Sequence, residues 1–191
     1  MSQNSDKLET KNEKETVNWK SELISWIQII IAAAVIALFL NSCIIANSQI
    51  PSESMENTIM AHDRVIGSRL SYLFSEPERG DVIIFHYPDD PTGDTYYVKR
   101  VIGLPGDVID IHDGGVYLNG SDEPYIKEPM ETDPNHPLHF EVPEDSYFMM
   151  GDNRNDSWDA RFWENTWVTK DKLIAKVLFR YYPFNKMGVI H

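Results

Sequence analysis

One long apolar run stands near the start of the chain, and only short apolar runs follow it. Residues 23–46 read LISWIQIIIAAAVIALFLNSCIIA and contain no charged residue. In a helix this run would extend roughly 36 Å, at about 1.5 Å per residue, and the apolar interior of a bilayer is about 30 Å thick. A buried helix of a soluble protein rarely runs so far without a charge. The pattern therefore predicts a transmembrane anchor over residues 23–46.

The basic residues around this run predict its orientation. Lys14 and Lys20 come shortly before it, and the next basic residue after it is Arg64. Basic residues flanking a membrane span are enriched on the cytoplasmic side. We therefore expect a polar cytoplasmic tail over residues 1–22 and an extracytoplasmic domain over residues 47–191, in a single-pass protein of the cell membrane.

Two kinds of cleaved segment are alternatives to a permanent anchor. A secretory signal would have a shorter apolar core and a small-residue cleavage site. The letters LNSC, ending at Cys43, faintly resemble a lipoprotein processing site, but Asn41 fits that pattern poorly. The long acidic leader is also unusual for an export signal, so an uncleaved anchor is favoured.

Beyond the apolar run, short stretches of β-branched and aromatic residues recur between Gly, Pro, Asn and Asp. This pattern is typical of strands separated by turns. It predicts a mostly β domain of short antiparallel strands, with few helices and at most one short helical turn near residues 54–60. A hairpin is expected at Asp113-Gly114. The expected strands are 64–68, 81–87, 96–103, 107–112, 115–118, 146–150 and 172–182.

Two adjacent basic residues interrupt the strand expected over residues 96–103. Side chains two positions apart share a face of a strand, so Lys99 lies with Tyr97 and Val101, and Arg100 lies on the opposite face. Both faces are otherwise largely apolar. Each basic side chain must therefore emerge at a sheet edge, with its stem along apolar surface, or be held in a partly buried site.

Composition excludes several classes of function. The net charge of −13 gives a surface that repels phosphate backbones, so we expect no nucleic-acid partner. A single cysteine rules out an intrachain disulfide. The six histidines form no HExxH pattern and no zinc-type cluster with cysteine, so we expect no metal and no other cofactor.

Three short blocks carry residues suited to peptide hydrolysis. They are IPSESMENTI at 50–59, RGDVIIFHYP at 79–88 followed by YYVKRVIGLPGD at 96–107, and GDNRNDSWDAR at 151–161. Hydrolysis needs a nucleophile, a base and donors for the oxyanion. No histidine stands in a triad context, whereas a lysine can act as the base if burial lowers its pKa. In this order after an N-terminal apolar run, the blocks resemble bacterial type I signal peptidases.

The resemblance implies a role for each residue of the reacting group. Ser54, which precedes Met55, would be the nucleophile, and Lys99 would be the general base. The hydroxyl of Ser52 and the backbone N–H of Ser54 would form the oxyanion hole. The family needs no metal and no cofactor for this chemistry.

The resemblance also implies a supporting set of residues. Ser157 would hydrogen-bond the lysine and orient it, while Asp159 and Arg161 would form a buried ion pair that fixes the loop carrying Ser157. Four apolar residues would lie near the cleft and line shallow pockets for small substrate side chains. These are Ile50, Met55, Ile59 and Val98.

One position departs from the family pattern. The family usually has proline where Asn57 stands in SMENTI. Proline fixes φ near −65°, so we expect its absence to loosen the turn behind the nucleophile without removing a reacting group.

The expected function is removal of signal peptides from exported preproteins by a membrane-bound serine endopeptidase, with cleavage after small residues of the Ala-x-Ala type. Its partners would be those signal peptides and the lipid bilayer. A self-cleaving repressor-type protease uses the same Ser–Lys pairing, but such proteins are cytosolic and carry a DNA-binding module. A membrane-tethered β domain that only binds or scaffolds other proteins is the non-catalytic alternative, and it would not need both reacting residues.

Overall fold

The computed structural model describes residues 19–127 and 129–191. These residues form two units, a helix that ends at Phe39 and a compact domain, Leu40–His191. The predicted polar tail, residues 1–22, lies outside the described residues except for its last four positions.

The first unit is helix α1 (Trp19–Phe39), which continues as the single π-helical turn η1 (Leu40–Ile44) at the start of the second unit. The helical stretch Trp19–Ile44 is long and apolar enough to cross a membrane. It starts at Trp19, ahead of the predicted start at residue 23. It ends at Ile44 and not at residue 46, because Ile45 and Ala46 already belong to the first strand. No Pro or Gly interrupts the run, so nothing in the sequence breaks the helix.

The second unit is built from antiparallel strands, which confirms the predicted β fold. Among the described residues, eight strands form one sheet in which β1, β2, β10, β3, β4, β8 and β9 are neighbours in that order, and β11 pairs with β10. Their bounds are β1 (Ile45–Gln49), β2 (Arg64–Ser68), β3 (Val82–His86), β4 (Tyr96–Gly103), β8 (Ser146–Met150), β9 (Val168–Thr169), β10 (Leu173–Tyr182) and β11 (Gly188–Val189).

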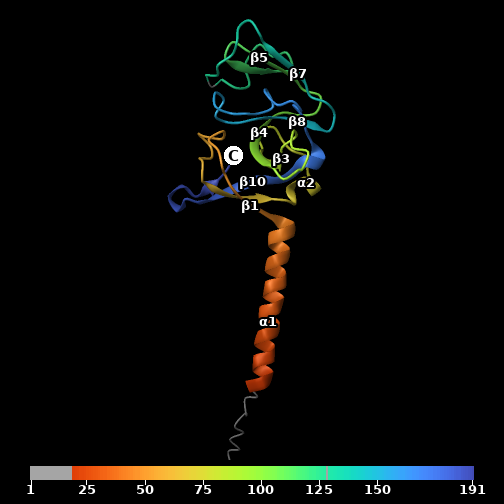
Figure 1. Cartoon of the computed structure of the whole chain (residues 1–191), viewed down its shortest axis with the longest axis vertical. Coiled ribbons are helices and arrows are strands. Elements are labelled where there is room, and N and C mark those ends of the chain that lie inside the picture. Colours follow the sequence, from red (N-terminus) through yellow and green to blue (C-terminus); the bar gives the residue numbers. More distant parts are fainter. Residues whose placement is uncertain (1–18, 128) are drawn as a thin grey trace, which may run out of the picture. The chain divides into compact units, whose positions relative to one another are not determined.

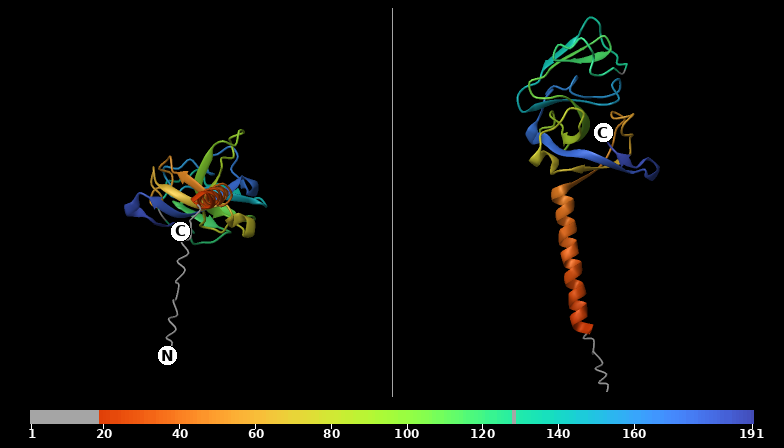
Figure 2. Two further views of the ribbon diagram at one scale, coloured as in Figure 1. Left: turned by 90° about the horizontal axis from the view of Figure 1, so that it is seen from below. Right: turned by 180° about the vertical axis from the view of Figure 1, so that it is seen from behind.

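A smaller sheet has the order β6 (Gly115–Leu118), β5 (Val108–His112) and β7 (Leu138–Glu141). Figures 1 and 2 show it at one end of the domain, with β8 and β4 between it and strands β10 and β1. The short helices are α2 (Ser71–Phe74), η2 (Lys170–Lys172) and η3 (Phe184–Lys186).

All seven expected strands are present, and the predicted hairpin joins β5 to β6. Asp113 and Gly114 both have positive φ, as a tight hairpin turn requires. Near residues 54–60, where at most one short helical turn was expected, the chain forms hydrogen-bonded turns, one of them closed between residues 55 and 59, and no regular helix. The sequence did not indicate β1, β7, β9 or β11.

Strand β3 is buried on both faces and separates two hydrophobic cores. Ile83 and Phe85 pack into the core shared with the smaller sheet. Val82 and Ile84 pack into the other core, together with residues of the segment that follows β1. Alternate side chains of one strand thus hold the two halves of the domain together. The neighbouring strand β4 and the segment 50–59 are fixed against this double core.

Candidate active site

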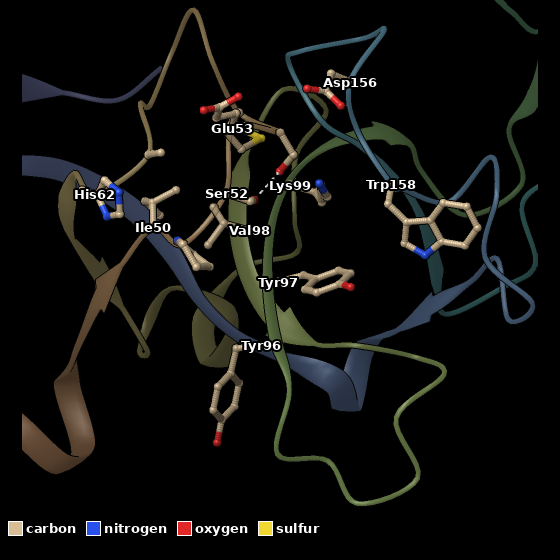
Figure 3. Close-up of a pocket in the computed structure, with 14 residues that line it drawn as sticks. Ile50, Ser52, Glu53, His62, Tyr96, Tyr97, Val98, Lys99, Asp156 and Trp158 are labelled. Carbon is tan, nitrogen blue, oxygen red and sulfur yellow. Dashed lines mark hydrogen bonds between the residues drawn. The ribbon is translucent and has the colours of Figure 1, made fainter.

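A cleft lies between the segment that follows β1 and the first half of β4. Its volume is about 480 Å³. Figure 3 shows Ile50 and His62 on one side and Trp158 on the other, with Ser52 and Lys99 between them. The lining residues are Ile50, Pro51, Ser52, Glu53, Ser54, Met55, Ala61, His62, Tyr96, Tyr97, Val98, Lys99, Asp156 and Trp158.

Apolar anchors fix the serine segment on the cleft wall. Met55 and Ile59 are buried in the second core, on the C-terminal side of Ser54. The Ile59 N–H donates to the Met55 carbonyl at 2.8 Å, which closes a tight turn. The two serine hydroxyls are hydrogen-bonded at 3.1 Å, Ser52 Oγ to Ser54 Oγ. The anchors therefore hold two hydroxyl groups side by side at the cleft.

Asn57, which stands where the family usually has proline, lies in the turn between Met55 and Ile59. Its φ is +82°, in the left-handed region. Proline cannot adopt this angle, whereas Asn adopts it more readily than most residues. The turn is also tied down, because the Thr58 carbonyl accepts from Arg180 Nη1 at 3.1 Å and Thr58 Oγ1 accepts from Arg100 Nη2 at 3.3 Å. Asn57 therefore lies in a turn that proline could not form and that two arginine side chains anchor.

A proline at this position should disrupt the turn. We expect Asn57→Pro to destabilise the folded chain by more than about 1 kcal/mol, since the native angle is closed to proline. Asn57→Gly should be tolerated, because glycine reaches positive φ without steric cost. Urea unfolding of the two purified variants measures the difference. Equal stability of the two would contradict the assigned conformation.

Lys99 is held inside the cleft wall. Only 3% of it is exposed, and its Nζ donates to Ser157 Oγ at 3.0 Å. The amine also lies 5.7 Å from the centre of the Tyr97 ring. Burial lowers the pKa of Lys99 to about 8; the charge of Asp159 opposes this shift, and that of Arg161 adds to it. The sequence left open whether Lys99 emerges at a sheet edge or is held in a partly buried site, and the structure shows the buried placement.

The loop over residues 151–161 carries the hydroxyl that meets Lys99. Asp159 is fully buried and accepts from Arg161 Nε at 2.8 Å and from the Gly151 N–H at 3.0 Å. Arg161 is nearly as buried, with 4% of its side chain exposed, and it donates to the Arg154 carbonyl at 2.8 Å. A buried charge pair that satisfies backbone groups at both ends of a loop fixes its shape. Ser157 is thereby held at the end of Lys99.

This loop also locks onto the serine segment. The Asn153 N–H donates to the Ser54 carbonyl at 3.1 Å, and Asn153 Nδ2 donates to the Glu53 carbonyl at 3.3 Å. At Gly151 there is no space for a side chain, because a Cβ would overlap Ser157 Oγ and the Ser54 carbonyl. The contact between the two segments depends on glycine at this point.

A second ion pair, between Arg100 and Asp152, also holds the 151–161 loop in place. Arg100 donates to Asp152 from Nε at 2.8 Å and from Nη2 at 2.6 Å, and both side chains are largely buried. The pair links β4 to the start of the 151–161 loop. The strand pattern predicted Arg100 on the face opposite Lys99 and indicated no partner for it. The feature of the sequence that could have indicated this pair is Asp152, an acidic residue of the third block to which no partner was assigned.

The structure brings most of the predicted residues together. Ser52, Ser54 and Lys99 line one cleft, Ser157 contacts Lys99, and Asp159 pairs with Arg161. Of the predicted pocket residues, Ile59 is fully buried and is not among the described residues that line the cleft. The lining residues missed from sequence include Glu53, His62, Tyr96, Tyr97, Asp156 and Trp158. Tyr96 and Tyr97 reach the cleft from β4, whereas the other four reach it from turns and loops whose course the sequence pattern does not give.

The chain is similar in sequence to known proteins over most of its length. The family model described as signal peptidase, peptidase S26, matches residues 23–182. Signal peptidase I of Leptolyngbya laminosa is 37% identical over 176 residues, covering 88% of this chain and 84% of the relative. The probable signal peptidase I-2 of Synechocystis sp. is 34% identical over 176 residues, covering 87% and 78%. Signal peptidase I S of Bacillus subtilis is 33% identical over 185 residues, covering 91% and 96%.

The family match spans most of the chain, and each of these relatives exceeds 30% identity over most of both sequences. Signal peptides of preproteins are the substrates of this class of enzyme. The chain therefore belongs to the signal peptidase family, peptidase S26, and is a serine endopeptidase that removes signal peptides.

Proposed function

We propose that the chain cleaves signal peptides by a Ser–Lys dyad, with Ser54 as nucleophile and Lys99 as general base. The observation that carries the proposal is a buried lysine amine in the same cleft as a serine hydroxyl. A neutral amine can take the proton of a serine hydroxyl, and burial favours the neutral form. Ser157 orients the amine through its 3.0 Å hydrogen bond.

The steps follow from this arrangement. Lys99 Nζ takes the Ser54 hydroxyl proton as Oγ attacks the scissile carbonyl carbon. The Ser52 hydroxyl and the Ser54 N–H stabilise the oxyanion. The C–N bond then breaks, and the protonated Lys99 gives its proton to the leaving amine, which becomes the new N-terminus of the mature protein. Water, activated by the same amine, hydrolyses the ester that joins the signal peptide to Ser54.

The cleft supports selection of small substrate side chains. Ile50 and Met55 lie on its floor almost completely buried, and Val98 lies beside them on β4. Within the described part of the chain, β8 pairs only with Arg100, Val101 and Gly103 of β4, so the edge over residues 96–99 is open to an extended peptide. A peptide bound there would place alternate side chains against these apolar walls, which fits cleavage after Ala-x-Ala.

The helical stretch Trp19–Ile44 supports membrane anchoring, and the lysines near its start support a cytoplasmic N-terminus. Ser54 follows Ala46 by only eight residues, so the tether reaches about 30 Å even when fully extended. The nucleophile would act near the outer membrane surface, where the cleavage site of an export signal emerges.

The direct test is cleavage of a preprotein by the full chain in detergent or vesicles. The mature product should start directly after the Ala-x-Ala sequence, as N-terminal sequencing would show. Replacing either alanine of the substrate by a bulky residue should stop cleavage. Cleavage at an unrelated position, or indifference to the two alanines, would argue against the proposed specificity.

The pH dependence of cleavage should follow the protonation state of the Lys99 amine. Below a pKa of about 8 the Lys99 amine is increasingly protonated and cannot act as a base. We expect kcat/KM to rise about tenfold per pH unit up to that value and then to level off. A pH series from 6 to 10 with one peptide substrate measures this. A plateau already reached near pH 6.5, the ordinary range of histidine, would point to another base.

A further inference from the structure

An exposed aromatic pair stands beside the reacting group. Trp158 is 57% exposed and Phe162 is 50% exposed, and their rings stack with centroids 5.7 Å apart at an angle of 17°. Trp158 sits between Ser157, which contacts Lys99, and the buried Asp159. One face of the indole is thus covered by Phe162, while Trp158 also lines the cleft.

The indole is held in place by a chain of contacts. Its Nε1–H donates to Tyr87 Oη at 3.3 Å, and that hydroxyl donates to Asp89 Oδ2 at 2.9 Å. The Tyr87 ring stacks on Tyr97 with centroids 4.4 Å apart. Since Tyr97 is itself a cleft residue beside Lys99, the indole is fixed relative to the amine. A ring fixed before the substrate arrives loses little entropy on binding.

Reaction chemistry indicates which part of the substrate meets this ring. This step rests on the dyad proposed above. The base that deprotonates the nucleophile later protonates the leaving amine, so the residues after the scissile bond lie on the base's side. Trp158 and Asp156 belong to the loop that contacts Lys99, and Figure 3 shows Trp158 across the cleft from Ile50. The ring therefore faces the start of the mature protein.

The charge at this place favours a cation. Asp156 is exposed at the cleft, and Figure 3 shows Glu53 at the same end of it. Lys99 is the only lysine or arginine among the described residues that line the cleft. A ring face attracts a cation, and neighbouring carboxylates reinforce the attraction. The geometry points to a subsite, formed by Trp158 and Asp156, that binds a lysine or arginine side chain within the first two residues of the mature protein.

The test uses one signal peptide with four mature segments that carry Ala, Lys, Leu or Glu at the second position. We expect the full chain to cleave the Lys substrate about tenfold faster than the Ala substrate in kcat/KM, and the Glu substrate more slowly than either. Trp158→Ala should bring the Lys-to-Ala ratio close to one, and Trp158→Phe should keep part of it. Asp156→Asn should reduce the Lys-to-Glu ratio, and added NaCl should do the same.

Phe184→Ala removes a still more exposed ring that is not among the described residues that line the cleft, so its Lys-to-Ala ratio should equal that of the parent. Equal rates for Lys and Glu in the parent chain would overturn the proposal. A preference for Leu over Lys that survives Asp156→Asn would also overturn it, in favour of an apolar subsite. If the Ala substrate is not cleaved at all, the proposed function fails, and that result is distinct from a missing preference.

Discussion

Lys99→Met should reduce preprotein cleavage at least about 10⁴-fold, the scale seen when the base of a serine protease is removed. Methionine keeps most of the volume of the lysine stem, so the buried site stays filled while the amine is lost. Ser54→Ala should have an equally large effect, because the two groups act in one step. Single-turnover cleavage with excess enzyme measures both variants, and the double variant should be no worse than either alone.

Two controls make this result specific. Lys176→Met removes another lysine of the same sheet, one that pairs with Asp81 at 2.6 Å, and it should retain activity. His62→Ala removes the only histidine among the described lining residues and should also retain most activity. If His62→Ala were as inactive as Lys99→Met, the base would have to be reassigned.

Asp159→Ala should produce the largest loss of stability among the site variants. It leaves the nearly buried guanidinium of Arg161 without its carboxylate and the Gly151 N–H without its acceptor. Removing one partner of a buried pair costs about 3–5 kcal/mol. Urea unfolding of the detergent-solubilised chain measures this cost, and the folded remainder should cleave slowly because Ser157 is no longer held in place.

An exposed ion pair of the same domain provides the matched comparison. Lys127 Nζ lies 3.9 Å from a Glu123 carboxylate oxygen, and both side chains are mostly exposed. Glu123→Gln should change stability by less than about 1 kcal/mol. Similar costs for the exposed and the buried pair would show that the 151–161 loop does not depend on Asp159.

The fold was predictable where a strand is a run of β-branched and aromatic residues between turn signals. β4 and β10 are of this kind. β1 was hidden because its first residues continue the apolar run of the helix, and β9 and β11 have only two residues each. Such short edge strands are defined by their neighbours and leave almost no pattern in the sequence.

The proposed reacting residues, together with Ser157 and the Asp159–Arg161 pair, were predictable because three blocks carry them, but the other contacts that hold them were not. The left-handed angle of Asn57 cannot be read from residue type, since Asn adopts other angles as well. The pairing of Arg100 with Asp152 and the bonds from Asn153 to the serine segment join distant parts of the chain. A local pattern contains no information on which distant segments will meet. The same limit hid Trp158 and Asp156.

Asn153 stands 100 residues after Glu53, and its side chain donates a hydrogen bond to the Glu53 carbonyl. This separation affects when the site can form during synthesis of the chain. Until the third block has been synthesised and folded, the Lys99 amine lacks the Ser157 hydroxyl to which it is hydrogen-bonded, and the serine segment lacks its contacts with Asn153. If the proposed dyad is the reacting group, the chain should therefore gain activity only after its last third has folded against the serine segment.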